Sequence, residues 1–90
     1  MKRKEILSKA EQCVNGQRDQ DYGKIENNFQ TIAELWSAYK GIQFSAIDVA
    51  MMMALLKVAR IKNGGGTGDS FVDLAGYAAC AGELAEKGGK

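Results

Sequence analysis

The sequence predicts an all-α fold, a small up-down domain of four helices that spans residues 1–90. None of the 90 residues is proline, which would interrupt a helix. The apolar segments repeat at helical spacing, and we find no stretch that alternates apolar and polar residues as a half-buried strand does. Gly16 and Gly41 follow the first two segments, and glycine is the residue that most often ends a helix.

The first two predicted helices cover about residues 2–15 and 24–40. Ile6, Ala10 and Val14 share one face of the first helix. The second helix has the most regular apolar face of the chain, with the spacing of an amphipathic helix. This face is formed by Ile25, Phe29, Ile32, Ala33, Trp36 and Tyr39.

The third and fourth predicted helices cover about residues 45–62 and 69–86 and are joined by a glycine-rich connection. Ser45 and Asp48 have the spacing of a capping box at the start of the third helix. Between Asp48 and Lys57 this helix has no charged residue, so we expect it to be central or to form an oligomer interface. The apolar face of the fourth helix is predicted to contain Phe71, Leu74, Ala78, Ala81 and Leu84. Another side of it presents the small and polar residues Asp73, Gly76, Tyr77 and Cys80.

The composition of the chain indicates where the protein is located and which classes of partner it binds. The net charge of +1 gives no reason to expect a nucleic-acid partner, because such proteins carry a basic surface. No run of about 18 apolar residues predicts a membrane helix, and the N-terminus lacks the apolar core of a signal peptide. We therefore expect a cytoplasmic protein. A chain of this length buries only about 60% of its unfolded surface, so we also expect a homo-oligomer that forms through apolar helix faces.

Several kinds of chemistry are excluded or weakly indicated. Histidine is absent, which removes histidine metal ligands and the Ser-His-Asp triad. The glycine-rich connection has no strand before it and no lysine after its last glycine, so it does not meet the phosphate-loop pattern and no cofactor is predicted. Cys13 and Cys80 leave two alternatives, a disulfide or two buried free thiols, and their helical positions favour free thiols in a reducing compartment.

Two pairs of charges flank the connection between the third and fourth helices. Lys57 and Arg60 share a helix face, where they either complement the helix dipole or bind a phosphate group. Asp69 and Asp73 follow at the start of the next helix. They either cap this helix and pair with Lys57 or Arg60, or hold Mg²⁺ through carboxylate oxygens.

Two further segments carry candidate ligand-binding residues. Arg18, Asp21 and Tyr22 lie before the second helix, in a stretch that is either an ordinary turn or a lid whose ring stacks on a base. Asn28 lies on the second helix, either on its exposed side or directed into a cleft. Tyr77 lies on the small and polar side of the fourth helix.

Four short motifs contain most of these residues. They read R-x-x-D-Y-G at 18–23, N-F-x-x-I-x-x-L-W at 28–36, M-x-x-L-K-x-A-R at 53–60 and D-S-x-x-D-x-A-G-Y at 69–77. In this combination the chain resembles a family of small, mostly uncharacterised phage and prophage proteins. It is more distantly similar to nucleotide-modification-associated phage domains and to all-α NTP pyrophosphatases (MazG-like). MazG-like enzymes hold Mg²⁺ with an E-x-x-E and E-x-x-D pattern that is not matched here, where only Asp69 and Asp73 could replace the second pair.

The candidate residues and the resemblance together leave three functional hypotheses, and we expect binding rather than catalysis. In the first, the protein sequesters a nucleotide-type ligand, including cyclic nucleotide signals of host defence. Arg18, Lys57 and Arg60 would bind phosphate, Tyr22 would stack, and Asp69 or Asp73 would contact ribose or base. In the second, Asp69 and Asp73 hold Mg²⁺ in a nucleotide pyrophosphohydrolase. In the third, the same charges form a buried network in a structural or protein-inhibiting adaptor.

Overall fold

The computed structural model describes residues 1–15, 25–65 and 68–88. These residues form four α-helices and no strand, so the predicted all-α fold is confirmed for the described part of the chain. The helix bounds lie within a residue or two of the predicted ones. No helix in these ranges is both long and apolar enough to span a membrane. The helices are α1 (Arg3–Asn15), α3 (Ile25–Lys40), α4 (Ala46–Arg60) and α5 (Gly68–Glu86). A turn, η1 (Ile61–Gly65), follows α4 and contains Gly64 with a left-handed backbone (φ 82°).

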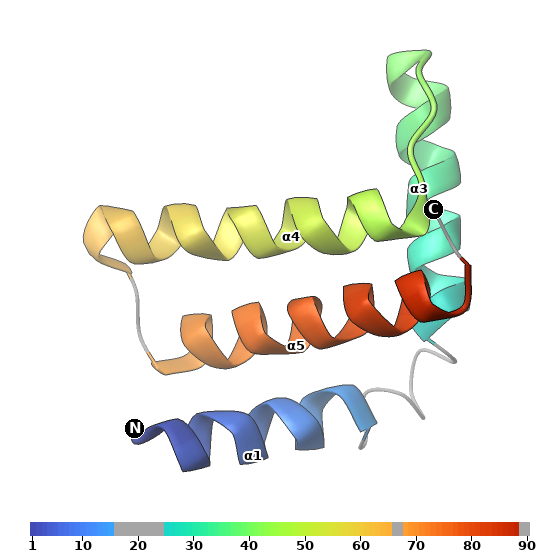
Figure 1. The fold of residues 1–90 in the computed structure, drawn as a ribbon. Helices are drawn as coiled ribbons and strands as arrows, with labels where there is room; N and C mark the ends of the chain where they lie inside the picture. Colours follow the sequence, from blue (N-terminus) through green and yellow to red (C-terminus); the bar gives the residue numbers. More distant parts are fainter. Residues whose placement is uncertain (16–24, 66–67, 89–90) are drawn as a thin grey trace.

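The helices do not all follow one another up and down. Figure 1 shows α4 and α5 side by side and antiparallel, with α1 on the other side of α5 and running in the same direction as α5. Helix α3 instead stands across the end of this layer, where α4 begins and α5 ends. It packs mainly on α4. The up-down path therefore holds for the α4–α5 hairpin, and α3 closes one end of the hairpin.

A compact corner between α3 and α4 produces the crossing. Gly41 ends α3 with a left-handed backbone (φ 73°), as its position predicts. The hydroxyl of Ser37 donates to the carbonyl of Ala33 (2.7 Å) and accepts from the backbone N–H of Phe44 (2.8 Å). The rings of Trp36 and Phe44 meet edge to face at 6.1 Å. These contacts fix the direction in which the chain leaves α3.

The predicted capping box begins α4. The backbone N–H of Asp48 donates to the hydroxyl of Ser45 (3.1 Å), and the N–H of Ser45 donates to Oδ2 of Asp48 (2.9 Å). Two N–H groups at the helix start, which have no partner within the helix, are satisfied in this way.

Replacing Ser45 with alanine should lower the free energy of unfolding by about 1 kcal/mol, because one of these N–H groups loses its acceptor. Urea unfolding followed by circular dichroism measures this change. Ser8→Ala is the matched control, since Ser8 is exposed inside α1, where alanine is the better helix former. Equal destabilisation by the two substitutions would show that the cap contributes nothing.

The core is small and rich in alanine. Phe29 and Ala33 of α3 pack against Val49 and Ala50 of α4, and Leu84 of α5 completes this cluster. The short side chains allow the helix backbones to approach closely. Because the cluster contains so few large side chains, each of them carries much of the stability.

Three residues of the predicted apolar faces are exposed. Tyr39 is 88% exposed because it lies near the end of α3, which projects beyond α4 in Figure 1. Phe71 is 44% exposed. The apolar face predicted for the fourth helix is therefore wrong at Phe71, and Ala78 is exposed as well. Helix α5 lies between α1 and α4, so it buries the side with the small residues Gly76 and Cys80 as well as Ala81 and Leu84 of the predicted face.

Both cysteines are free thiols, as predicted. Cys80 is buried, but Cys13 is exposed, so the prediction of two buried thiols is wrong for Cys13. The reason is that α1 packs mainly on α5 alone, which covers only one side of the helix.

Candidate functional site

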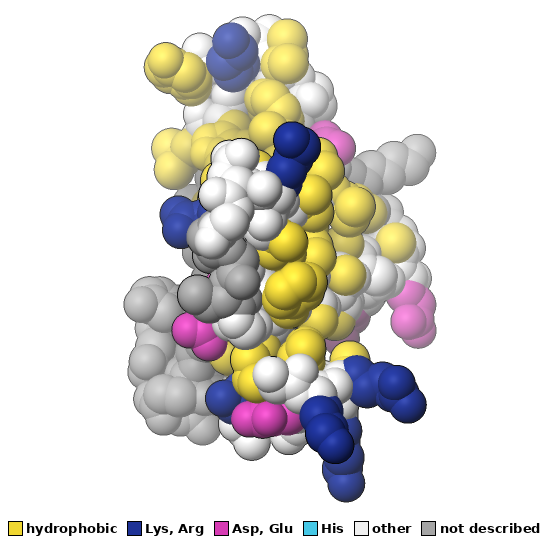
Figure 2. All heavy atoms as spheres, turned by 90° about the vertical axis from the view of Figure 1, so that its left-hand side faces the viewer, with side chains coloured by type: hydrophobic (Ala, Val, Ile, Leu, Met, Phe, Trp, Pro, Cys, Tyr) yellow, Lys and Arg dark blue, Asp and Glu magenta, His cyan; other side chains and the backbone are white. Residues whose placement is uncertain are grey.

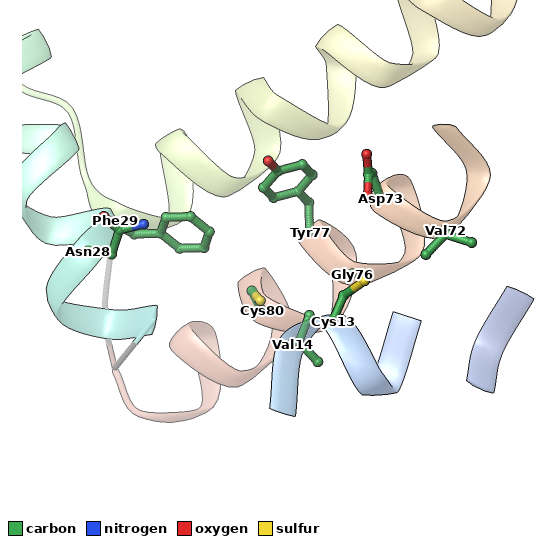
Figure 3. Close-up of a pocket in the computed structure, with 9 residues that line it drawn as sticks. All are labelled: Cys13, Val14, Asn28, Phe29, Val72, Asp73, Gly76, Tyr77 and Cys80. Atoms are coloured by element: carbon green, nitrogen blue, oxygen red, sulfur yellow. The ribbon is translucent and has the colours of Figure 1, made fainter. Parts of the chain in front are cut away.

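Helices α1, α3 and α5 line a cavity of about 40 Å³. Figure 3 shows it between the end of α1, the beginning of α3 and the middle of α5. Its wall is mostly apolar, with a few polar groups, as in many ligand sites. The lining residues are Cys13, Val14, Asn28, Phe29, Val72, Asp73, Gly76, Tyr77 and Cys80.

Three of the predicted ligand-binding residues meet at this cavity. Asn28 comes from α3, whereas Asp73 and Tyr77 come from successive turns of α5 and share one face of it. Figure 3 shows the Tyr77 ring between Phe29 and Asp73. The rings of Phe29 and Tyr77 are 6.2 Å apart and inclined by 36°. The site therefore combines an amide, a carboxylate and an aromatic surface.

An ion pair connects this site to α4. Nζ of Lys57 lies 2.9 Å from Oδ2 of Asp73, and the two side chains are 17% and 35% exposed. The predicted pairing of an aspartate with Lys57 across the hairpin is confirmed. By comparison, the pair of Lys9 and Glu5 is longer (3.6 Å) and about half exposed. Because a shielded pair is screened less by water and salt, the Lys57–Asp73 contact is the stronger of the two.

The other predicted site residues do not line the cavity. Arg60 is exposed near the end of α4 and makes no ion pair within the described part of the chain. Asp69 is exposed in the first turn of α5, which begins at Gly68, so Asp69 is not the cap itself. Arg18, Asp21 and Tyr22 lie outside the described residues.

The two aspartates proposed to hold Mg²⁺ have different surroundings in the structure. Asp73 contacts Lys57, and Asp69 is exposed one turn earlier on α5. Within residues 1–15, 25–65 and 68–88, no three Asp, Glu, Cys or His side chains gather as metal ligands would.

Helix α1 contributes to the site in a way that the sequence did not indicate. A methyl group built on Gly76 would lie 3.2 Å from Cγ1 of Val14, which is closer than most side-chain contacts. Gly76 therefore allows α1 to approach α5, and this approach brings Val14 and Cys13 to the cavity. The only signal in the sequence was the run of small residues at Gly76 and Cys80.

The size of the cavity limits what can enter it. A volume of about 40 Å³ holds a few water molecules. A site that encloses a whole small-molecule ligand usually has about 300 Å³ or more. The described cavity is therefore too small to enclose a whole small-molecule ligand.

Fold and sequence together place the protein among small all-α phage proteins. The chain belongs to the family described as Domain of unknown function (DUF6378), which matches residues 5–85. It is 54% identical over 74 residues to the Gene 55 protein of Mycobacterium phage L5, covering 81% of this chain and 47% of that protein. It is 44% identical over 82 residues to the Gene 55 protein of Mycobacterium phage D29, covering 91% and 54%.

The chain thus spans about half the length of these curated relatives. No solved structure matches it. The predicted resemblance to small uncharacterised phage proteins is confirmed at the level of the family. The more distant similarity to MazG-like enzymes stays a prediction.

Proposed function

We propose that the protein binds a phosphorylated, nucleotide-type ligand at this cavity and holds it without cleaving it. The observation that carries the proposal is the meeting of Asn28, Asp73 and Tyr77, from motifs far apart in the sequence, at one cavity with Lys57 at its edge. For a phage protein, the fitting ligand is a nucleotide signal of host defence, such as a cyclic nucleotide. The protein would then act in the cytoplasm of the infected cell.

Each side chain has a suitable role in such a complex. The amide of Asn28 both donates and accepts hydrogen bonds, as recognition of a base edge requires. Tyr77 and Phe29 offer apolar ring surface beside it. Asp73 accepts hydrogen bonds from ribose hydroxyls, and Lys57 then becomes available to a phosphate group. Arg60, one turn further along α4, is exposed and has the forked guanidinium that binds two phosphate oxygens.

One observation favours a second function, the structural or protein-inhibiting adaptor. The ammonium group of Lys57 is already paired with Asp73 at 2.9 Å, which is what a purely structural contact between α4 and α5 would look like. The Mg²⁺-dependent pyrophosphohydrolase has less support, because Mg²⁺ would have to displace Lys57 from Asp73. We therefore retain the adaptor as the alternative that an experiment must separate from ligand binding.

A thermal-shift screen tests the proposal with linear nucleotides and with cyclic mono- and dinucleotides, each with and without Mg²⁺. A ligand at about 100 times its dissociation constant adds about 2.7 kcal/mol of stability, which is easily seen as a higher melting temperature. We expect a shift that does not need Mg²⁺ and a ligand that is recovered intact by chromatography.

Substitutions at the cavity test whether the ligand binds there. Asn28→Ala and Lys57→Gln should each reduce the ligand-induced shift, whereas Lys9→Gln, which removes only an exposed ion pair on α1, should leave it unchanged. A shift that survives both site variants would place the ligand elsewhere. Absence of any shift would favour the adaptor, and a Mg²⁺-dependent product would favour the enzyme.

A further inference from the structure

Helix α4 buries only one of its sides. Ala46, Val49, Ala50 and Ala54 are buried on that side. The opposite side is apolar but exposed, and Figure 2 shows hydrophobic side chains gathered in a band on the face of the molecule where α4 ends. Such a band is unusual on a small monomeric protein. The exposed apolar residues of α4 include Met51 (47% exposed), Met52 (41%), Leu55 (63%) and Val58 (45%).

The exposed side of α4 has opposite charges at its two ends. Asp48 lies near the beginning of α4 and Lys62 lies in η1, and both are exposed. Each is seven residues, or about two helical turns, from Leu55. The two charges and Leu55 therefore share one strip of the helix surface, with the leucine halfway between them.

We propose that this face is the interface of a two-fold symmetric dimer, in which the α4 helices of two copies pack antiparallel with the symmetry axis at Leu55. A two-fold interface requires a surface that is complementary to itself. About Leu55, the antiparallel register places Met51 opposite the partner's Ala59 and Met52 opposite the partner's Val58. Every apolar residue of the strip then faces another apolar residue.

The same register pairs the charges. Asp48 lies opposite the partner's Lys62 at each end of the interface, so the dimer gains two pairs of opposite charge. The antiparallel helix dipoles add to this attraction. A parallel arrangement would instead place Asp48 beside the partner's Asp48. The charge pattern therefore selects a second copy of this chain as the occupant, and it selects the antiparallel direction.

The surface of α3 next to this strip is also suited to the partner. A groove where α3 projects beyond α4 is lined by the mostly apolar residues Trp36, Tyr39, Phe44 and Met52 together with the charged Lys40. Because Met52 faces the partner's Val58 in the proposed register, the end of the partner's α4 would lie along this groove. In the proposed dimer the partner would cover part of Tyr39, which is 88% exposed in a single copy. The cavity lined by α1, α3 and α5 contains no residue of α4, so the interface and the cavity are distinct.

Sedimentation equilibrium of the purified protein tests the dimer. We expect twice the chain mass for the natural sequence and a monomer for Leu55→Arg, whose charges would face each other across the axis. Leu7→Arg is the matched control, since Leu7 has the same 63% exposure but lies on α1, and it should stay dimeric. A monomer of natural sequence at about 100 μM, or a dimer that Leu55→Arg leaves intact, overturns the proposal.

Cysteine cross-linking tests the register, in a Cys13→Ser background that removes the exposed thiol. A mixture of Met51→Cys and Ala59→Cys chains should give a disulfide-linked dimer. Met51→Cys alone should not, because the register separates the two copies of residue 51 by about eight residues, or ~12 Å along the helices. Efficient cross-linking of Met51→Cys to itself would show a different register and overturn the antiparallel arrangement.

Discussion

Replacing Phe29 with alanine should lower the free energy of unfolding by about 3 to 5 kcal/mol, the cost of truncating a buried aromatic side chain. Phe29 is 5% exposed, is the largest side chain of the buried cluster, and contacts Tyr77 through its ring. Because small domains have only about 5 to 15 kcal/mol of stability in total, this variant should be close to unfolded at 37 °C. Chemical denaturation at 15 °C measures the change.

Phe71→Ala provides the matched control for this substitution. Phe71 is 44% exposed, so its truncation removes less buried surface and creates no closed cavity. We expect a loss of less than about 1.5 kcal/mol for Phe71→Ala. If the two variants lost equal stability, the result would contradict the assignment of Phe29 to the core and of Phe71 to the surface.

Replacing Gly76 with leucine should also destabilise the protein, by about 1 to 3 kcal/mol, because it overfills the contact between α5 and α1. The first atom of any side chain at this position would lie 3.2 Å from Cγ1 of Val14. Leucine is the better helix former by roughly 1 kcal/mol, so a net loss of stability can come only from this packing conflict. Thermal and urea unfolding both measure it.

The same substitution at Gly82 separates packing from helix propensity. Gly82 lies on α5, and apart from its chain neighbours and the nearby backbone of α5 no atom lies within 4 Å of an added methyl group. Gly82→Leu should therefore stabilise the protein by up to about 1 kcal/mol. Val14→Ala should partly restore the stability of Gly76→Leu, because it removes the side chain that the leucine strikes. Stabilisation by Gly76→Leu, equal to that of Gly82→Leu, would contradict the close approach of α1 and α5.

The candidate site was predicted in part, and the outcome differs between its residues for a physical reason. The spacing of Asp73 and Tyr77 places both on one helix face, so their shared position could be derived from the sequence. The sequence could not show whether Lys57 or Arg60 contacts Asp73, because Lys57 and Arg60 are neighbours on one face of α4. The choice depends on the rotation of α4 against α5, and the packed hairpin turns Lys57 inward and leaves Arg60 exposed.

The sequence by itself determined the helices and their ends. The apolar spacing, the capping box of Ser45 and Asp48 and the left-handed Gly41 are local features, and each acts over one or two turns of chain. Only the tertiary structure decided that α3 crosses the hairpin, that α5 buries its small residues instead of Phe71, and that α1 reaches the cavity through Gly76. These outcomes depend on how closely whole helices can approach one another. The distance between two packed helices depends on contacts between residues far apart in the sequence, so it cannot be derived from the residue pattern of a single helix.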